Sequence, residues 1–227
     1  MISFSHVYKT YDENRHALRD LNLTINPQDF IFLTGESGAG KTTLFRLLIH
    51  QERITTGKLI YNNNDMTQFK AKQIADYRKK IGIVFQDFKL VKELSIFENV
   101  ALPLRIQKIK EIEIKKRVLE ILISLEINEL SSQFPDFVSG GEKQRIAIAR
   151  AMVTNPDIVL ADEPTGNLDK KNSDLVINLF EKLSDQGKTV IIVTHDENLV
   201  RRNEQRNNFR HVILEKGEIK NQRKMIL

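Results

Sequence analysis

Cysteine is absent from this 227-residue sequence. A disulfide framework and a thiolate metal site are therefore excluded, a composition typical of the cytosol. Long apolar runs are missing as well, and none approaches the roughly 18 residues that a membrane-spanning helix needs. The first residues, Met1 to Phe4, lack the basic start and apolar core of a signal peptide. If the protein works at a membrane, we expect another chain to hold it there, without insertion of this chain into the bilayer.

Repeats, low-complexity segments and interdomain linkers are missing too, so the length suits a single domain over residues 1–227. Apolar segments predict strands over 21–25, 29–34, 57–61, 81–85, 158–161 and 189–194, and a terminal hairpin over 212–219. Helical patterns fall over 42–50 and 175–183. Between them, apolar residues recur at helical spacing, namely Ile114, Val118, Ile121, Leu122 and Leu125, and we expect a helical subdomain over 87–155. The alternation of strands and helices predicts an α/β fold with a mainly parallel core sheet.

The net charge of +5 gathers in two basic runs, Lys108 to Arg117 and Arg201 to Lys224. Such runs are commonly solvated helix faces, although anionic lipid or nucleic acid could also attract them. The first run contains no aromatic side chain that could stack on bases. We therefore expect no nucleic-acid partner.

A phosphate-binding loop is the strongest motif in the chain. The residues Gly35-Glu36-Ser37-Gly38-Ala39-Gly40-Lys41-Thr42 match G-x-x-x-x-G-K-[ST] at every fixed position, and Thr43 follows. Glycines let backbone N–H groups turn around a phosphate, Lys41 adds a positive charge, and the Thr42 hydroxyl can bind Mg²⁺. Because a buried strand precedes the motif and a helix follows it, we expect a nucleotide site here.

Two acids end a later apolar strand, at Asp162 and Glu163. A carboxylate beside a phosphate loop can hold Mg²⁺, and its neighbour can take a proton from the attacking water. On its own, a strand that ends in two acids is often only a solvated strand end. Together with the phosphate loop, it predicts a metal role for Asp162 and a general-base role for Glu163.

A third segment, Ser139-Gly140-Gly141-Glu142, begins a helix, with Ser139 as the expected N-cap. Its bare glycine amides make a second anion site. The segment resembles the LSGGQ signature of ABC-transporter-type ATPases, with Val138 in place of leucine and Glu142 in place of glutamine. The resemblance implies the ABC nucleotide-binding fold of P-loop NTPases, with an N-terminal antiparallel β part. It also implies ATP-dependent homodimers in which the signature of one protomer closes over the nucleotide of the other.

Other positions match that family one by one. Gln86 resembles the Q-loop glutamine, which senses Mg²⁺ or water and couples the site to a membrane partner. His195 resembles the switch histidine at the γ-phosphate, and Asp169 ends a segment similar to the D-loop. Tyr11 lies where the family often places an aromatic side chain that stacks on adenine, although a surface-loop tyrosine is also a common finding.

Within the family, Phe32 to Lys41 and Ala161 to Asp169 resemble the FtsE group of bacterial cell-division ATPases. This resemblance implies a membrane partner of the FtsX type, a peripheral location at the cytoplasmic face of the inner membrane, and control of cell-wall hydrolysis. ATPases of lipoprotein-release or macrolide-type exporters share the second stretch and remain the alternative. A DNA-associated ABC ATPase is disfavoured because no sustained heptads appear. An inactive scaffold is disfavoured because Lys41, Asp162, Glu163 and His195 are all present.

Overall fold

The computed structural model describes residues 1–12 and 16–224 and divides the chain into two compact units. One unit holds residues 1–78 and 183–227, and the other holds residues 79–182. The predicted helical segment 87–155 falls entirely within the second unit. That both units form a single ABC ATPase domain stays a proposal.

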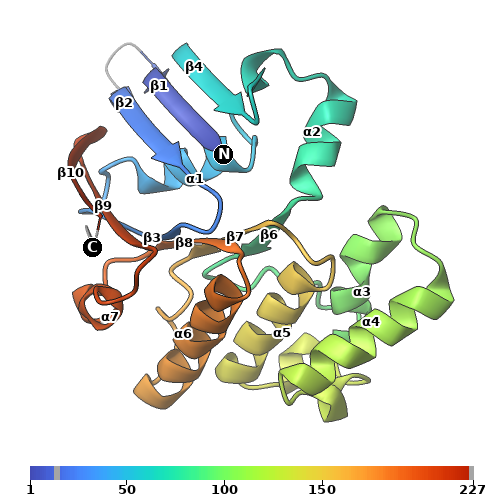
Figure 1. The fold of residues 1–227 in the computed structure, drawn as a ribbon. Coiled ribbons are helices and arrows are strands. Elements are labelled where there is room, and N and C mark those ends of the chain that lie inside the picture. The colour runs from blue at the N-terminus through green and yellow to red at the C-terminus, as the bar shows by residue number, and fades with distance from the viewer. Residues whose placement is uncertain (13–15, 225–227) are drawn as a thin grey trace. The chain divides into compact units, whose positions relative to one another are not determined.

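The first unit contains an antiparallel sheet with the strand order β2-β1-β4-β5, in which β1, β2 and β4 lie side by side (Figure 1). Its elements are β1 (Ile2–Thr10), β2 (His16–Ile25), β4 (Thr56–Tyr61), β5 (Asn64–Asp65), the 3-10 turn η1 (Met66–Gln68) and helix α2 (Ala71–Arg78). Alternate residues of β1 and β2 are buried, as expected for strands with one face on the core. This is the expected N-terminal antiparallel part.

The same unit contains parallel strand pairs, which form the rest of its core. Strand β3 (Phe30–Thr34) pairs in parallel with β8 (Thr189–Val193) on one side and with β9 (Phe209–Glu215) on the other. All residues of β3 and β8 are buried, which agrees with their continuous apolar sequence. The unit is completed by α1 (Lys41–Leu48), α7 (Glu197–Asn203) and β10 (Glu218–Lys224), which forms the predicted hairpin with β9.

The basic run Arg201 to Lys224 is divided between α7, β9 and β10. One of its cations, Arg210, is not a surface charge: its guanidinium donates to the Asp29 carboxylate and to the Thr24 carbonyl oxygen. Both members of the Arg210–Asp29 pair are buried. Removing one partner would leave a buried charge uncompensated, so this part of the basic run holds the fold together.

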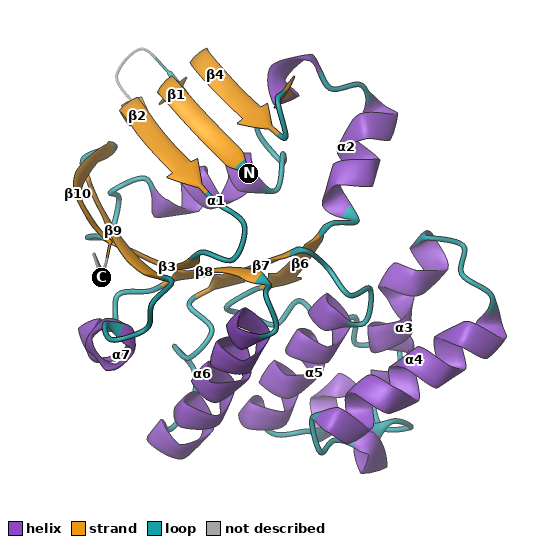
Figure 2. Ribbon diagram, viewed as in Figure 1, coloured by secondary structure: helices purple, strands orange, loops and turns teal. Residues whose placement is uncertain are grey.

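The second unit pairs strands β6 (Ile81–Val84) and β7 (Ile158–Asp162) in parallel and carries the helices α3 to α5 (Figure 2). Its other elements are α3 (Ile96–Ile106), α4 (Glu111–Ser124), η2 (Asn128–Leu130), η3 (Pro135–Phe137), α5 (Gly140–Met152) and α6 (Lys170–Asp185), whose last residues belong to the first unit. Helix α5 packs closely on β6, because a Cβ added at Gly82 would lie 2.5 Å from the carbonyl oxygen of Ala151. Among the described residues, no helix is long and apolar enough to cross a membrane.

Candidate functional site

The phosphate loop connects the buried strand β3 to helix α1, as the motif requires. Gly35 has φ of 148°, and a Cβ there would lie 2.1 Å from the carbonyl oxygen of Leu214 in β9. Gly40, the N-cap of α1, has φ of 106°. Helix α1 has neither a capping side chain nor an acidic residue in its first turn. Its positive end is therefore left to attract an anion held by the loop.

The side chains after the loop point in different directions. The Lys41 ammonium lies over the loop and donates to the carbonyl oxygens of Gly35, at 2.6 Å, and Glu36, at 3.0 Å. Thr42 is exposed, so its hydroxyl is available to a metal ion or to solvent, whereas Thr43 is buried. The start of α1 thus presents the Lys41 ammonium group, which can contact phosphates, and the exposed Thr42 hydroxyl, which can bind Mg²⁺.

Tyr11 is anchored to this helix through its hydroxyl group. The hydroxyl donates to Glu52 Oε1 at 2.7 Å and lies 3.3 Å from the Thr43 hydroxyl. The Lys9 ammonium lies over the ring, 4.8 Å from its centre. Burial raises the pKa of Glu52, but hydrogen bonds from Tyr11, Lys9 and Arg46 outweigh burial and hold the pKa below its usual value. A negative Glu52 therefore fixes the Tyr11 ring beside α1, with two-fifths of the tyrosine exposed.

A pocket of about 420 Å³ brings His195 together with the start of the phosphate loop. Its lining includes Thr34, Gly35, Glu36, His195, His211 and Lys220. Within this lining, the Thr34 hydroxyl forms a 2.7 Å hydrogen bond with Nε2 of His211. Neither His211 nor Glu52 carries a sequence signal, because their bonding partners lie 177 and 41 residues away along the chain.

In the second unit, Asp162 ends strand β7 and Glu163 follows it in a left-handed conformation, with φ of 45°. Such backbone strain in a residue other than glycine is concentrated at functional sites. Gly166 lies close to both predicted catalytic side chains: a Cβ there would be 3.6 Å from Nε2 of Gln86 and 3.7 Å from Cβ of Glu163. Asn167 also donates to the Gln86 carbonyl oxygen at 3.1 Å. The Q-loop, the general-base candidate and the D-loop therefore meet within this unit.

The signature segment begins helix α5 with a capping box. Ser139 is the N-cap, as predicted, and accepts a hydrogen bond from the Glu142 N–H, while the Glu142 carboxylate accepts bonds of 2.7 Å from the Ser139 N–H and hydroxyl. The bond from the Ser139 side chain, followed by that from its backbone, lowers the pKa of Glu142. The substitution of glutamate for glutamine in the motif therefore places a fixed negative charge at the helix start.

Asp169 and Gly141 are linked through Asn172. Both carboxylate oxygens of Asp169 accept hydrogen bonds from Asn172, one from its N–H at 2.8 Å and one from its side chain at 2.9 Å. A Cβ added at Gly141 would lie 2.7 Å from the side-chain oxygen of Asn172. A larger residue at 141 would therefore displace the Asn172 side chain, and Asp169 acts as a cap at the start of α6. Its predicted contact with nucleotide stays a prediction.

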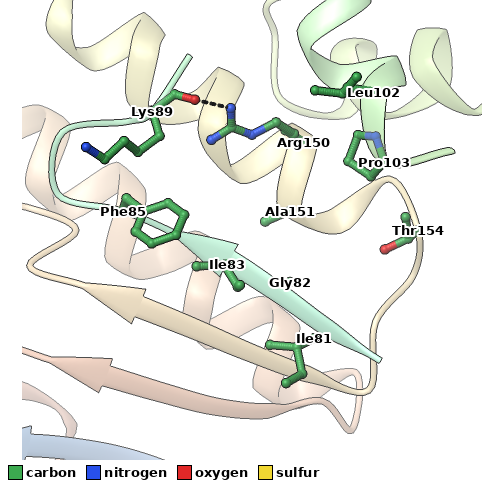
Figure 3. A pocket seen from close by; sticks show the side chains of 10 residues that line it. All are labelled: Ile81, Gly82, Ile83, Phe85, Lys89, Leu102, Pro103, Arg150, Ala151 and Thr154. Atoms are coloured by element: carbon green, nitrogen blue, oxygen red, sulfur yellow. Dashed lines mark hydrogen bonds between the residues drawn. The ribbon is translucent and has the colours of Figure 1, made fainter. Parts of the chain in front are cut away.

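A second pocket, of about 290 Å³, is lined by residues of β6, α3 and α5 (Figure 3). Ile81, Ile83, Phe85, Leu102, Pro103 and Ala151 give it an apolar lining, and Lys89 and Arg150 add positive charge. Arg150 donates to the carbonyl oxygens of Phe88 and Lys89, each at 2.5 Å, and these two residues have φ of 60° and 49°. Burial lowers the pKa of Arg150. This arginine fixes the course of the chain just after Gln86.

The predicted site residues thus form two groups. Tyr11, the phosphate loop, Lys41, Thr42, Thr43 and His195 belong to the first unit. Gln86, the signature segment, Asp162, Glu163 and Asp169 belong to the second. Among the residues that the structure describes, no group of three or more histidine or acidic side chains could hold a metal ion by itself.

The sequence and the structure both resemble known ATP-binding cassettes. The ABC transporter family model matches residues 18–166. The cell division ATP-binding protein FtsE of Bacillus subtilis is 44% identical over 88% of each chain, and FtsE of Escherichia coli K12 is 41% identical over 96% of this chain and 97% of its own. A solved ATP-binding cassette, a dimer in a post-hydrolysis state with ADP and Pi bound, superimposes over the full length of both chains with a TM-score of 0.89 and 36% identity.

Proposed function

Because the chain belongs to the ABC transporter family of ATPases, we propose that it is the ATP-hydrolysing subunit of an FtsE-type cell-division complex that regulates cell-wall hydrolysis. The predictions of the family, of the α/β fold class and of ATPase activity are confirmed. The observation that carries the finer proposal is the match to two FtsE proteins at more than 40% identity over most of the chain. We place the protein at the cytoplasmic face of the bacterial inner membrane, held there by a partner.

The phosphate loop would hold ATP. Lys41 would contact the phosphates of the nucleotide, and Tyr11 would stack on its adenine ring. Mg²⁺ would be held by the Thr42 hydroxyl, the Asp162 carboxylate and the Gln86 amide oxygen. All three are hard oxygen donors, the kind that Mg²⁺ prefers, and the remaining ligands would be nucleotide phosphates and water. When bound there, Mg²⁺ would supply positive charge beside the phosphates, while Glu163 would take the proton of the attacking water and His195 would contact the γ-phosphate.

Hydrolysis is tested with Glu163→Gln and Lys41→Ala. Glu163→Gln removes the proton acceptor and should lower the turnover of ATP by roughly 10²–10⁴-fold while ATP binding persists. Lys41→Ala removes the cation and should abolish binding of ATP. Phosphate release and equilibrium binding of a fluorescent ATP analogue measure the two effects. If Glu163→Gln turned over ATP within a few-fold of the wild type, Glu163 would not be the base.

The nucleotide would be enclosed by an ATP-dependent homodimer in which Ser139 and Gly141 act on the nucleotide of the other protomer. Mixing Lys41→Ala chains with Ser139→Arg chains would then place both defects in one site and leave the other intact. We expect partial recovery of ATPase activity on mixing, and dimers of Glu163→Gln should accumulate with ATP in light scattering. Absence of recovery in proven heterodimers would mean that each chain works alone.

The membrane partner would be an integral protein of the FtsX type, and the pocket of Figure 3 is its proposed docking site. An apolar lining that includes two cationic side chains suits a short amphipathic helix that carries an acidic residue. Four apolar residues follow Gln86 closely in the sequence, and these are Phe88, Leu90, Val91 and Leu94. The structure does not place any of the four in the pocket lining, and none of them is fully buried.

A matched pair of variants tests this site. Leu102→Glu places a carboxylate in the pocket, and Val91→Glu places one on an exposed neighbouring position outside it. Only Leu102→Glu should abolish co-purification with membranes that contain the partner, while both variants keep their melting temperature and their ATPase activity in solution. Mass spectrometry of the captured membrane protein identifies its class. Capture of a lipoprotein-release or macrolide-type permease would replace the FtsE-type assignment and leave the ATPase assignment intact.

A further inference from the structure

Helix α4 carries two separate apolar stripes. Its inner stripe, Ile114, Val118 and Leu122, is completely buried. A second stripe, Ile112, Leu119 and Ile123, recurs at intervals of seven and four residues and therefore lies on a single face of the helix. These side chains are 87%, 45% and 60% exposed. Since the inner stripe already packs the helix onto α3 and α5, folding does not require the outer one.

Positive charge accompanies the exposed stripe. Lys115 and Lys116 are exposed within the same turns, and Lys108 and Lys110 precede the helix. Two acidic side chains nearby form ion pairs with arginines. Glu111 pairs with Arg105 at 3.1 Å, and Glu113 pairs with Arg117 at 2.6 Å.

Among the residues that the structure describes, none of these four lysines forms a salt bridge. Glu120 is the one further acid in this helix. We call the outer side of the helix, formed by Ile112, Lys115, Lys116, Leu119 and Ile123, the basic apolar face.

From this combination we propose that the basic apolar face of α4 lies on an anionic lipid bilayer, with its aliphatic side chains in the headgroup boundary and its lysines at the phosphates. Interfacial helices have this composition, because lysine stems cover apolar surface while their ammonium groups reach the anionic surface. The face is the convex side of one helix, which suits a flat membrane, whereas a partner helix is ordinarily received in a groove. This contact is independent of the proposed pocket for a membrane protein, and it is shallow rather than spanning.

Vesicle co-sedimentation of the purified full chain, without any membrane protein, tests the proposal. Vesicles of phosphatidylcholine alone are compared with vesicles to which phosphatidylglycerol has been added, at low and high salt. The variant Lys115→Ser/Lys116→Ser should bind anionic vesicles about 25-fold more weakly, since each lysine near an anionic surface contributes roughly a factor of five. Ile112→Ser and Ile123→Ser should each weaken binding about tenfold, because an apolar side chain no longer leaves water.

Matched controls lie elsewhere on the surface. Lys70→Ser/Lys72→Ser removes the same charge at the start of α2, and Leu175→Ser removes an exposed aliphatic side chain from α6. Both controls should bind vesicles like the wild type. All face variants should keep the wild-type melting temperature because the altered side chains are exposed.

Three outcomes would overturn the proposal. The first is that the wild-type chain binds the two kinds of vesicle equally, and the second is that the control variants lose as much vesicle binding as the face variants. The third is that Ile112→Ser loses a protein dimer while its vesicle binding is unchanged. The last outcome would assign the face to a second copy of the chain.

Discussion

Arg150 offers a quantitative test of how the segment after Gln86 is held. Its guanidinium bonds the carbonyl oxygens of Phe88 and Lys89, both in left-handed backbone conformations. A left-handed residue other than glycine costs roughly 1–2 kcal/mol. Each hydrogen bond from a charged donor contributes about 1.5–3 kcal/mol. The two bonds therefore offset the strain of the two residues, and the arginine keeps them in place.

The variant Arg150→Met keeps an unbranched apolar side chain and removes both bonds. Because it also removes the cost of burying a cation, we expect the free energy of unfolding to fall by about 2–4 kcal/mol. For a chain of this size, that corresponds to a fall in melting temperature of roughly 4–16 °C. Urea denaturation and calorimetry measure the two quantities.

The control is Arg105→Met, which breaks a solvent-exposed ion pair with Glu111. That change should lower the free energy of unfolding by about 1 kcal/mol or less. Adding Lys89→Gly to Arg150→Met should recover part of the loss, since glycine adopts the left-handed conformation without strain. The reasoning is refuted if Arg150→Met is no more destabilising than Arg105→Met, or if Lys89→Gly recovers none of the stability lost in Arg150→Met.

Three further predictions concern the nucleotide site. Gly35→Ala should abolish ATP binding in a fluorescence assay and lower the melting temperature, because its Cβ would overlap a β9 carbonyl oxygen at 2.1 Å. Tyr11→Phe keeps the ring but loses the bond to Glu52, so steady-state kinetics should show a several-fold higher KM for ATP with unchanged kcat. Ser139→Ala should destabilise the protein by about 1 kcal/mol at neutral pH. Since the folded-state pKa of Glu142 is depressed below 4.5, this difference in melting temperature should shrink as the pH falls through that folded-state value.

The sequence predicts the parts of the fold that are locally encoded. Strands β3, β7 and β8 are continuous apolar runs, and the phosphate loop is one contiguous segment whose glycines determine its shape. Strand β1 is harder to recognise because its alternation breaks at His6, which has φ of 49° beside a shift in strand register. Helix α2 buries only Tyr77 and so has no apolar stripe to reveal it.

The contacts that shape the candidate site are mostly long-range and could not be predicted from the sequence. Arg150 meets residues 61 and 62 positions away, and the chain gives no sign that Phe88 and Lys89 turn into left-handed conformations. For this reason the sequence does not show which residues near Gln86 line the pocket. Exposure, rather than sequence, distinguishes Ile112 and Ile123 from their buried neighbours on α4.

The contact at Gly82 has a mechanical consequence. Helix α5 approaches β6 with no side chain between the Gly82 Cα and the Ala151 carbonyl oxygen. Side chains between two elements can absorb a small displacement by changing rotamer. A direct contact between main chains cannot adjust in this way. A displacement of α5 at Ala151 would therefore be passed directly to β6, which ends two residues before Gln86. An alanine at position 82 would place its Cβ 2.5 Å from the Ala151 carbonyl oxygen, so the helix and the strand would have to move apart.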